Sequence, residues 1–436
     1  MLRKTFSRTQ RIAFSLASTL VASAAVSGQE NAPFYASQES PIATVVTPQF
    51  IALGFDDNAD YEGMMFVRSI LYRYRNPRGD DSHAGQRLSA TFFNHCGAND
   101  TDPTLLGLWS ALVHEGHEVA NHSQTHPDDK INWDPLNNWM TYDDWYAEIA
   151  QCQNLIEQVY AFGGKPMPNH TGFRAPYLTY SDATFEALIA NGLNYDVSLP
   201  AGITPEEDGT NNYWPHTLDD GSPSQWLAGG VWKQPINTYP GFWEIPLTSL
   251  IVPPDDLMTE FGLQYSLRDK IASRVSYFDP VSGKGDNFDW NLYFTPDWGA
   301  AGLNRDDVLA IYKYNLQLRL QGNRSPLVLG LHSNLYGLVN GSETFGTPET
   351  TTADRQYVLT EFIEYALSFP EVRFVTHTDM IDWMISPEPI ISDWQMQRPY
   401  HAGDTVFFSD EVWEANWWSY NEQPTATIHS PWRIAN

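Results

Sequence analysis

The chain of 436 residues has little cysteine, few basic residues and no long apolar run. Two cysteines are too few for a disulfide scaffold or for a metal site built from several thiolates. Only 25 Lys and Arg stand against 53 Asp and Glu, and the resulting formal charge of −28 disfavours a nucleic-acid partner. No stretch approaches the ~20 apolar residues that a membrane span requires, so we expect no membrane partner.

Residues 1–24 have the pattern of a signal peptide, with a basic start, a short apolar run at 12–21 and small residues at 22–24. We therefore expect a secreted, extracellular protein, and we expect a monomer. The alternative for this segment is an uncleaved membrane anchor. In an oxidising compartment Cys96 and Cys152 could form one disulfide, and the alternative is a buried, unpaired pair of thiols.

Short apolar, β-branched or aromatic runs between residues 49 and 379 give eight strand candidates. Helical patterns lie between several of them, at 104–115, 141–162, 182–191, 305–321 and 354–368. This alternation predicts an α/β fold, which we interpret as a distorted (β/α) barrel. The stretches 200–240 and 253–298 are rich in Gly, Pro, Asp and aromatic residues, and we expect them to form surface loops around the barrel mouth.

Several polar residues follow the strand candidates directly, where catalytic groups gather in such barrels. Asp56 and Asp57 end the first strand, and their carboxylates can diverge, one toward a metal and one toward water. The alternative for this pair is a helix cap or a surface turn. His122 and His126 bracket HSQTH, and two imidazoles with one carboxylate form a zinc-type ligand set that leaves a coordination position open. The alternative is two solvated loop histidines.

Two more polar residues have comparable positions. Arg174 stands in FRAPY, where Pro176 favours an extended, rigid exit from the strand, and the alternative is a structural salt bridge. His332 ends the apolar run PLVLGL, which suits an acid or base in a pocket. The alternative for His332 is a hydrogen-bonded core histidine.

In this order FDD, HSxxH, RAPY and the late LH resemble the motif series of the polysaccharide deacetylase (NodB-like) carbohydrate esterases. The similarity covers roughly residues 49–387, runs closest to chitin deacetylases, and predicts a catalytic domain of that barrel type over 40–390. It implies Asp57, His122 and His126 as ligands of zinc, although other divalent transition metals suit the same set. It implies Asp56 as the general base, with Arg174 orienting Asp56 and pairing with its charge.

The resemblance also implies roles around the scissile bond. Tyr177 would donate its backbone N–H to the developing oxyanion, and His332 would protonate the departing amine. The family usually has Leu two residues before this histidine, lining the acetyl pocket. Here Gly330 stands at that position, flanked by Leu329 and Leu331, and we expect Leu331 to contact substrate.

A second departure concerns the Asp-Trp pair whose carboxylate tunes the histidine in this family. We find no standard copy of it and expect Asp196, in YDVS, to take that catalytic role. We expect Trp243 to help form the wall of the substrate pocket.

Residues 391–436 differ in character from the rest of the chain and are dense in tryptophan. The order YHAGDTVFF, VWEANWW and PW resembles the small chitin-binding modules of carbohydrate-binding families five and twelve. The resemblance predicts a small all-β domain that binds chitin through Tyr400, Trp417 and Trp418. The alternative is that most of these rings form the only hydrophobic core of so small a domain.

Both segments indicate the same polymer. We expect metal-dependent removal of acetyl groups from the N-acetylglucosamine units of chitin or its oligosaccharides, with chitin as partner and no nucleic acid. The alternatives are deacetylation of another glycan, such as peptidoglycan or acetylated xylan, and a catalytically dead chitin-binding protein.

Overall fold

The computed structural model describes residues 37–97, 102–129, 140–230 and 236–435, with no side chains described for 228–230. The signal peptide expected at 1–24 lies outside these residues. Over the described ranges, no helix combines the length and apolar character needed to cross a membrane.

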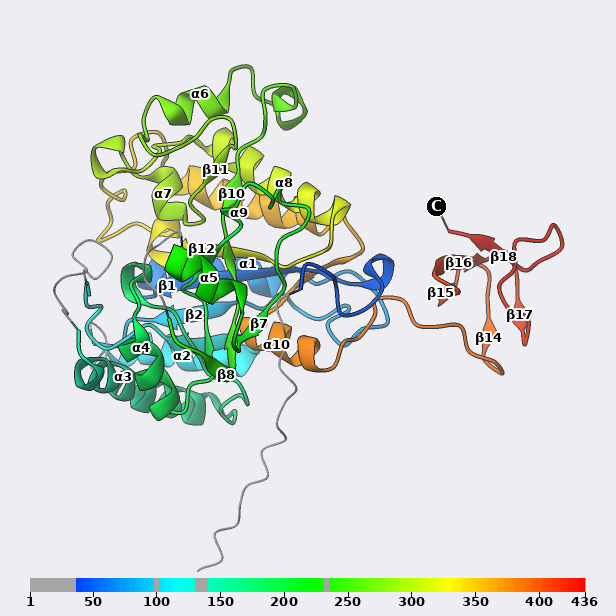
Figure 1. Cartoon of the computed structure of the whole chain (residues 1–436), viewed down its shortest axis with the longest axis horizontal. Helices are drawn as coiled ribbons and strands as arrows, with labels where there is room; N and C mark the ends of the chain where they lie inside the picture. The colour runs from blue at the N-terminus through cyan, green and yellow to red at the C-terminus, as the bar shows by residue number, and fades with distance from the viewer. Residues whose placement is uncertain (1–36, 98–101, 130–139, 231–235, 436) are drawn as a thin grey trace, which may run out of the picture. The chain divides into compact units, whose positions relative to one another are not determined.

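A mostly parallel sheet forms the centre of the molecule (Figure 1). Its strands follow the order β12-β1-β2-β3-β4-β5-β8-β7, with β13 also beside β1, and only β7 runs antiparallel to its neighbour. The strands are β1 (Gln49–Asp57), β2 (Thr91–Asn94), β3 (Glu118–Asn121), β4 (Gly172–Phe173), β5 (Tyr195–Asp196), β7 (His216–Leu218), β8 (Tyr239–Glu244), β12 (Leu327–His332) and β13 (Val372–Phe374). The predicted α/β class with a parallel sheet is confirmed.

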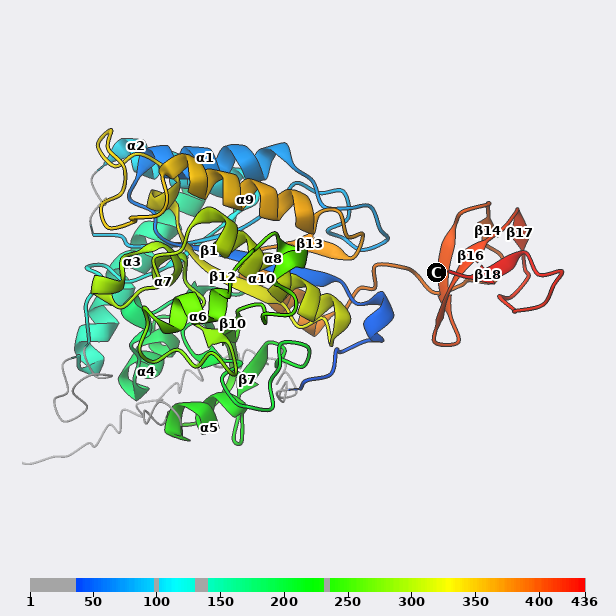
Figure 2. The same ribbon diagram turned by 90° about the horizontal axis from the view of Figure 1, so that it is seen from above.

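Helices flank this sheet, and the neighbours α2–α3, α3–α4 and α8–α9 pack against each other (Figure 2). The longer helices are α1 (Tyr61–Arg73), α2 (Pro103–Glu115), α3 (Tyr142–Gly163), α4 (Asp182–Ala190), α8 (Arg305–Gln321), α9 (Thr352–Ala366) and α10 (His377–Ile385). The five helices predicted from periodicity are α2, α3, α4, α8 and α9, with ends within two residues of the prediction. Capping boxes fix several starts, for example Thr141 with Asp144 at α3.

The stretches predicted as surface loops contain short elements. They are β6 (Pro200–Ala201), α5 (Pro223–Gly230), α6 (Leu267–Ala272), β11 (Lys284–Gly285), α7 (Asp289–Tyr293) and the 3₁₀ helices Met258–Phe261 and Pro296–Trp298. Two more short strands, β9 (Leu247–Thr248) and β10 (Leu250–Ile251), lie between those stretches. Asn287, just before α7, donates its side-chain N–H groups to the backbone oxygens of Thr248 and Val328, at 2.5 and 2.7 Å. It thereby bridges β9 and β12.

The two faces of β1 and β12 pack differently because side chains alternate along a strand. On β1, Leu53 and Phe55 belong to the large apolar cluster that includes helix residues, whereas Phe50 and Ala52 belong to a second cluster. The face of β1 that carries Phe50 and Ala52 continues through Gly54 to Asp56. On β12 the same alternation puts Leu331 in the large cluster. The inner face of both strands therefore leads from apolar residues to polar ones at the carboxyl ends.

The described part of 391–436 forms short antiparallel strands. They are β14 (Pro399–Tyr400), β15 (Thr405–Phe408), β16 (Glu411–Ala415), β17 (Ser419–Tyr420) and β18 (Trp432–Ile434), paired as β14–β17 and β15–β16–β18. Their buried cluster consists of Tyr400, Val406, Trp413, Ala415 and Trp432. That this segment is a separate domain with a boundary near 391 stays a prediction.

Candidate active site

The adjacent carboxylates at the end of β1 have different hydrogen-bond or ion-pair partners, although each also has an oxygen within 3.9 Å of His122 Nε2. Asp56 is 4% exposed, and its Oδ1 accepts a hydrogen bond from Arg174 Nη1 at 2.7 Å. Asp57 adopts φ 67°, in the left-handed region, and its Oδ1 lies 3.4 Å from His126 Nε2. The following helix is capped by Asp60. The helix-cap alternative for Asp56 and Asp57 is therefore wrong.

His122 and His126 follow β3 and meet Asp57. One ligand atom from each of these three residues lies within 4.8 Å of the other two. His122 Nδ1 lies 2.6 Å from the backbone oxygen of Arg174, which can only accept a hydrogen bond, so Nδ1 carries the proton. Nε2 is left with its lone pair and lies 3.8 Å from Asp57 Oδ1. Burial, and then His126, lower the pKa of His122 to about 3, which keeps the ring neutral.

This donor set fits a divalent transition metal. A buried neutral imidazole whose other nitrogen is fixed by a backbone carbonyl is a typical protein ligand for zinc. Asp57 and His126 contribute a carboxylate and a second imidazole from side chains that are 30% and 21% exposed. Three protein ligands that are open to solvent on one side match the composition of catalytic rather than structural zinc sites.

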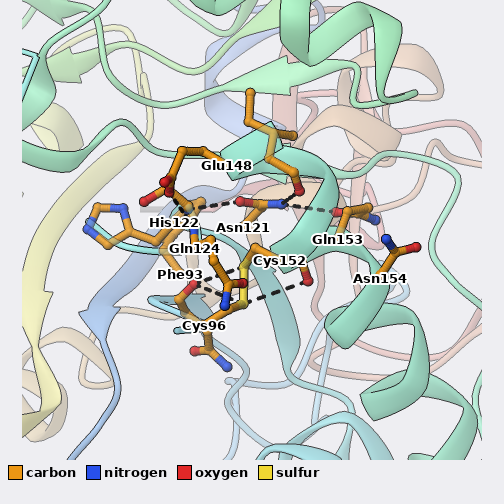
Figure 3. The surroundings of a disulfide bond; sticks show 12 residues. Phe93, Cys96, Asn121, His122, Gln124, Glu148, Cys152, Gln153 and Asn154 are labelled. Carbon is orange, nitrogen blue, oxygen red and sulfur yellow. Dashed lines mark hydrogen bonds between the residues drawn. A yellow bond between two sulfur atoms is a disulfide. The ribbon is translucent and has the colours of Figure 1, made fainter. Parts of the chain in front are cut away.

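Helix α3 holds the loop that carries these histidines (Figure 3). Glu148 accepts hydrogen bonds from the backbone N–H groups of Gln124 and Thr125, at 3.0 and 2.7 Å. Cys96 and Cys152 form a disulfide between the loop after β2 and α3. This confirms the expected disulfide, and the alternative of two unpaired thiols is wrong. The Cys96 N–H also donates to Ser123 O at 3.1 Å. The histidine loop is therefore attached to α3 directly through Glu148 and indirectly through Cys96.

Removing this disulfide should destabilise the protein, because the cross-link closes a loop with a sequence separation of 56 in the unfolded chain. We expect the double variant Cys96→Ser, Cys152→Ser to lose about 2–4 kcal/mol in the free energy of unfolding. Denaturant titration of the variant and of the oxidised and reduced wild type measures this difference. An unchanged unfolding midpoint would contradict the prediction.

Arg174 pairs with Asp56 in the interior of the protein. It is fully buried, and its guanidinium carbon lies 4.2 Å from the centre of the Phe93 ring. Gly54 provides the room, because a Cβ atom there would lie 2.7 Å from Arg174 Nη2. The expected ion pair between Arg174 and Asp56 is present. It fixes the orientation of the Asp56 carboxylate.

Tyr177 lies beside the histidines, with its ring centre 4.8 Å from that of His126. It stands in the 3₁₀ turn Pro176–Leu178 with φ 55°, and its side chain is 61% exposed. Its expected role as an oxyanion donor stays a prediction.

The partner of His332 is a residue that the sequence analysis missed. His332 Nδ1 donates to Asp289 Oδ1 at 2.7 Å, and the His332 backbone N–H donates to Asp289 Oδ2 at 2.8 Å. Burial alone would lower the pKa of His332, but the charge and hydrogen bond of fully buried Asp289, with smaller contributions from the charges of Asp57 and Asp56, outweigh it and raise the pKa to about 9. Trp290 follows directly, so the Asp-Trp pair that seemed missing is present at 289–290.

The prediction that Asp196 tunes the pKa of His332 is therefore wrong, because Asp289 is the carboxylate that binds this histidine. The Asp196 carboxylate accepts hydrogen bonds from the Ser198 backbone and hydroxyl at 2.7 and 2.8 Å. Burial raises the pKa of Asp196 to about 6. The error arose because Asp196 ends a recognisable strand, whereas Asp289 starts a short helix in a stretch interpreted as a surface loop.

The Phe288 ring explains why glycine stands at position 330, where the resembled family usually has leucine. A Cβ atom on Gly330 would lie 2.5 Å from the Phe288 ring, so the ring occupies the space that a side chain on β12 would fill. The ring centres of Phe288 and His332 are 5.8 Å apart, and Arg174 lies 5.4 Å from the Phe288 ring. Phe288 is 9% exposed. It thus provides the apolar surface next to His332.

Three residues expected to contact substrate are instead buried in apolar clusters, and those expectations are wrong. Leu331 is 0% exposed on the face of β12 opposite to His332. Trp243 is 1% exposed among core residues. Tyr400 is 2% exposed, packs against Trp432, and its hydroxyl accepts from the Gln395 N–H at 2.6 Å.

Two tryptophans of the C-terminal strands remain candidates for sugar contacts. Trp417 and Trp418 are 50% and 58% exposed, and the Trp418 ring is nearly parallel to the Tyr420 ring. Exposed flat rings of this kind are suited to stacking on sugar faces.

The site combines the buried carboxylate of Asp56, the metal-binding group beside it, and His332 with its carboxylate partner on the adjacent strand. This combination is typical of hydrolases that use a divalent metal. Asp56 and His332 are direct partners in the β1–β12 register, so the two acid-base candidates flank one point at the end of the sheet.

Comparison with known proteins finds a similarity to one family. The family model described as polysaccharide deacetylase matches residues 45–196, a segment that contains Asp56, Asp57, both metal-site histidines and Arg174. Residues 45–196 are therefore similar to polysaccharide deacetylase domains.

Two curated relatives have similar sequences. Chitin deacetylase 1 of Bombyx mori is 25% identical over 345 residues, which are 79% of this chain and 52% of the relative. Chitin deacetylase 8 of Bombyx mori is 24% identical over 348 residues, which are 79% of this chain and 72% of the relative. The chain thus spans about half the length of the first of these relatives.

Among solved structures, the Xyl-CE4 domain of a multidomain xylanase from the hindgut metagenome of Trinervitermes trinervoides shares 15% identity. The match covers 80% of this chain and 98% of that one, with a TM-score of 0.34.

Proposed function

We propose that this protein is a secreted, zinc-dependent deacetylase that hydrolyses the N-acetyl groups of N-acetylglucosamine units in chitin or its oligosaccharides. The observation that carries the proposal is the pairing of Asp56 with His332 across β1 and β12, beside the group formed by Asp57, His122 and His126. Acetate and a free amine on the sugar would be the products.

Amide hydrolysis needs a nucleophile, stabilisation of an oxyanion and a proton for a poor leaving group. When bound by Asp57, His122 and His126, zinc supplies a Lewis acid that polarises a carbonyl oxygen and acidifies water. Asp56, held by Arg174, accepts the proton from the attacking water. His332 holds a proton at neutral pH because its pKa is about 9, and it donates that proton to the departing amine.

Chitin is the substrate that several features favour over other glycans. Both curated relatives named above are called chitin deacetylases. The formal charge of −28 suits an uncharged polymer. The exposed rings of Trp417 and Trp418 are suited to sugar stacking, and Asp57, His122 and His126 are all present, which argues against a catalytically dead binding protein.

The direct test is the release of acetate by the full-length protein from chitin oligomers, acetylated xylan and peptidoglycan, with mass spectrometry of the products. We expect acetate from chitin oligomers together with amino sugars. Release from acetylated xylan or peptidoglycan alone would assign another glycan. Chitin binding without acetate release from any of them would support the binding-protein alternative.

Replacement of Phe288 should change the size of the acyl group that is accepted, because its ring fills the space above Gly330 beside His332. In Phe288→Ala we expect the ratio of kcat/KM for N-butyryl over N-acetyl sugars to rise about tenfold or more. Competition kinetics with the two acylated chitobioses measures the ratio, and Phe288→Leu should fall between Phe288→Ala and wild type. An unchanged ratio in both variants would show that Phe288 does not line the acyl pocket.

A further inference from the structure

A line of aromatic rings leads from the histidine partner to the protein surface. Asp289, which binds His332, is followed by Trp290 on α7. The Trp290 ring stacks on Phe294 at 5.2 Å between centres, and Phe294 stacks on Trp298 at 5.5 Å. Trp290 is half-buried, Phe294 is 8% exposed and Trp298 is 45% exposed, so the line reaches the surface at Trp298.

The last ring comes from a different loop. Phe345 lies 5.7 Å from Trp298 between ring centres and is 83% exposed. Its loop follows β12 and therefore starts just after His332, and both figures draw α7 and the loop after β12 on the same side of the molecule (Figures 1 and 2). Trp298 and Phe345 thus extend from the two segments that provide the acid and its partner.

Backbone contacts join the two loops and hold the Trp298 ring in place. The Thr295 N–H donates to Gly346 O at 2.8 Å, which ties the two loops together. Gly346 adopts φ 89°, and a Cβ atom there would lie 2.5 Å from the Trp298 ring, so only glycine fits this contact. Rings that are already fixed lose little conformational entropy when a ligand stacks on them.

We propose that Trp298 and Phe345 form a sugar-stacking platform that binds further units of the glycan chain whose acetyl group is removed beside His332. This proposal rests on the proposed function and adds an extended binding site to it. Exposed Trp and Phe faces suit the apolar faces of uncharged sugars. The acidic balance of the chain disfavours polyanionic chains, and continuity with Asp289 favours the substrate over an unrelated partner.

The test compares N-acetylglucosamine dimer and pentamer as substrates of the full-length protein. In Phe345→Ala and in Trp298→Ala we expect kcat/KM for the pentamer to fall about tenfold, while the dimer is unaffected. Phe345→Ala removes a ring that is 83% exposed, so its result does not depend on an effect on folding. The matched control is Phe162→Ala, an 80% exposed ring at the end of α3, which should change neither substrate.

Equal losses on dimer and pentamer, or no loss on the pentamer, would overturn the platform. If wild-type protein releases acetate from neither oligomer, the proposed function fails. Calorimetric measurement of pentamer binding then tests whether Trp298 and Phe345 bind sugar units. Weaker pentamer binding by Phe345→Ala than by wild type would support the platform. Equal binding by both proteins would overturn it.

Discussion

Replacing Asp56 by Asn should lower acetate release by about 10²–10⁴-fold, the range expected for loss of a general base. The amide keeps the size of the carboxylate, and its oxygen can still accept the hydrogen bond from Arg174 Nη1. It cannot take a proton from water. We therefore expect kcat to fall while the divalent metal content, measured by elemental analysis, stays that of wild type.

The matched control for this variant is Asp60→Asn. Asp60 lies just after β1 and caps α1 by accepting from the Gly63 N–H at 2.8 Å, a role that Asn fills almost as well. Its activity should remain close to wild type. An active Asp56→Asn enzyme would mean that another group accepts the proton.

Replacing Asp289 by Asn should produce the second large effect and a distinct pH signature. The amide oxygen can still accept from His332 Nδ1, but the negative charge that raises the pKa of His332 to about 9 is lost. His332 must be protonated to act as the acid, so activity falls as pH rises through its pKa. We expect kcat to drop about 10- to 100-fold and the alkaline limb to move from near pH 9 toward neutral pH.

A pH profile of kcat/KM for wild type and variant measures this shift. Asp196→Asn is the matched comparison, because Asp196 is equally buried but binds Ser198. Its alkaline limb should stay where the wild-type limb lies. If the limb moves in Asp196→Asn and not in Asp289→Asn, the assignment of the histidine partner is wrong.

Much of the site could be predicted because its residues end recognisable strands. Asp56, Asp57 and His332 each follow a run of apolar residues, and parallel strands bring their carboxyl ends to one edge. The motif order then assigned a role to each. The same local pattern predicted the five helices, whose polar caps and apolar periodicity are short-range features.

Asp289 and Phe288 could not be placed by the same reasoning. They lie in an irregular stretch and reach the site through a bridge between Phe288 and Gly330, a tertiary contact that no periodicity encodes. The signals available were the dipeptide at 289–290 and the glycine at 330, which together indicate that another segment fills the pocket. Tyr400 was misassigned because a small set of strands needs most of its rings as core.

The most direct test of the account is to remove bound metal with a chelator, add zinc back stepwise, and measure bound zinc and acetate release from chitin oligomers together. We predict that the metal-free protein is inactive, that activity rises in proportion to bound zinc up to about one ion per chain, and that His126→Ala recovers neither. Full activity in the metal-free protein would contradict the central claim that Asp57, His122 and His126 hold a catalytic metal.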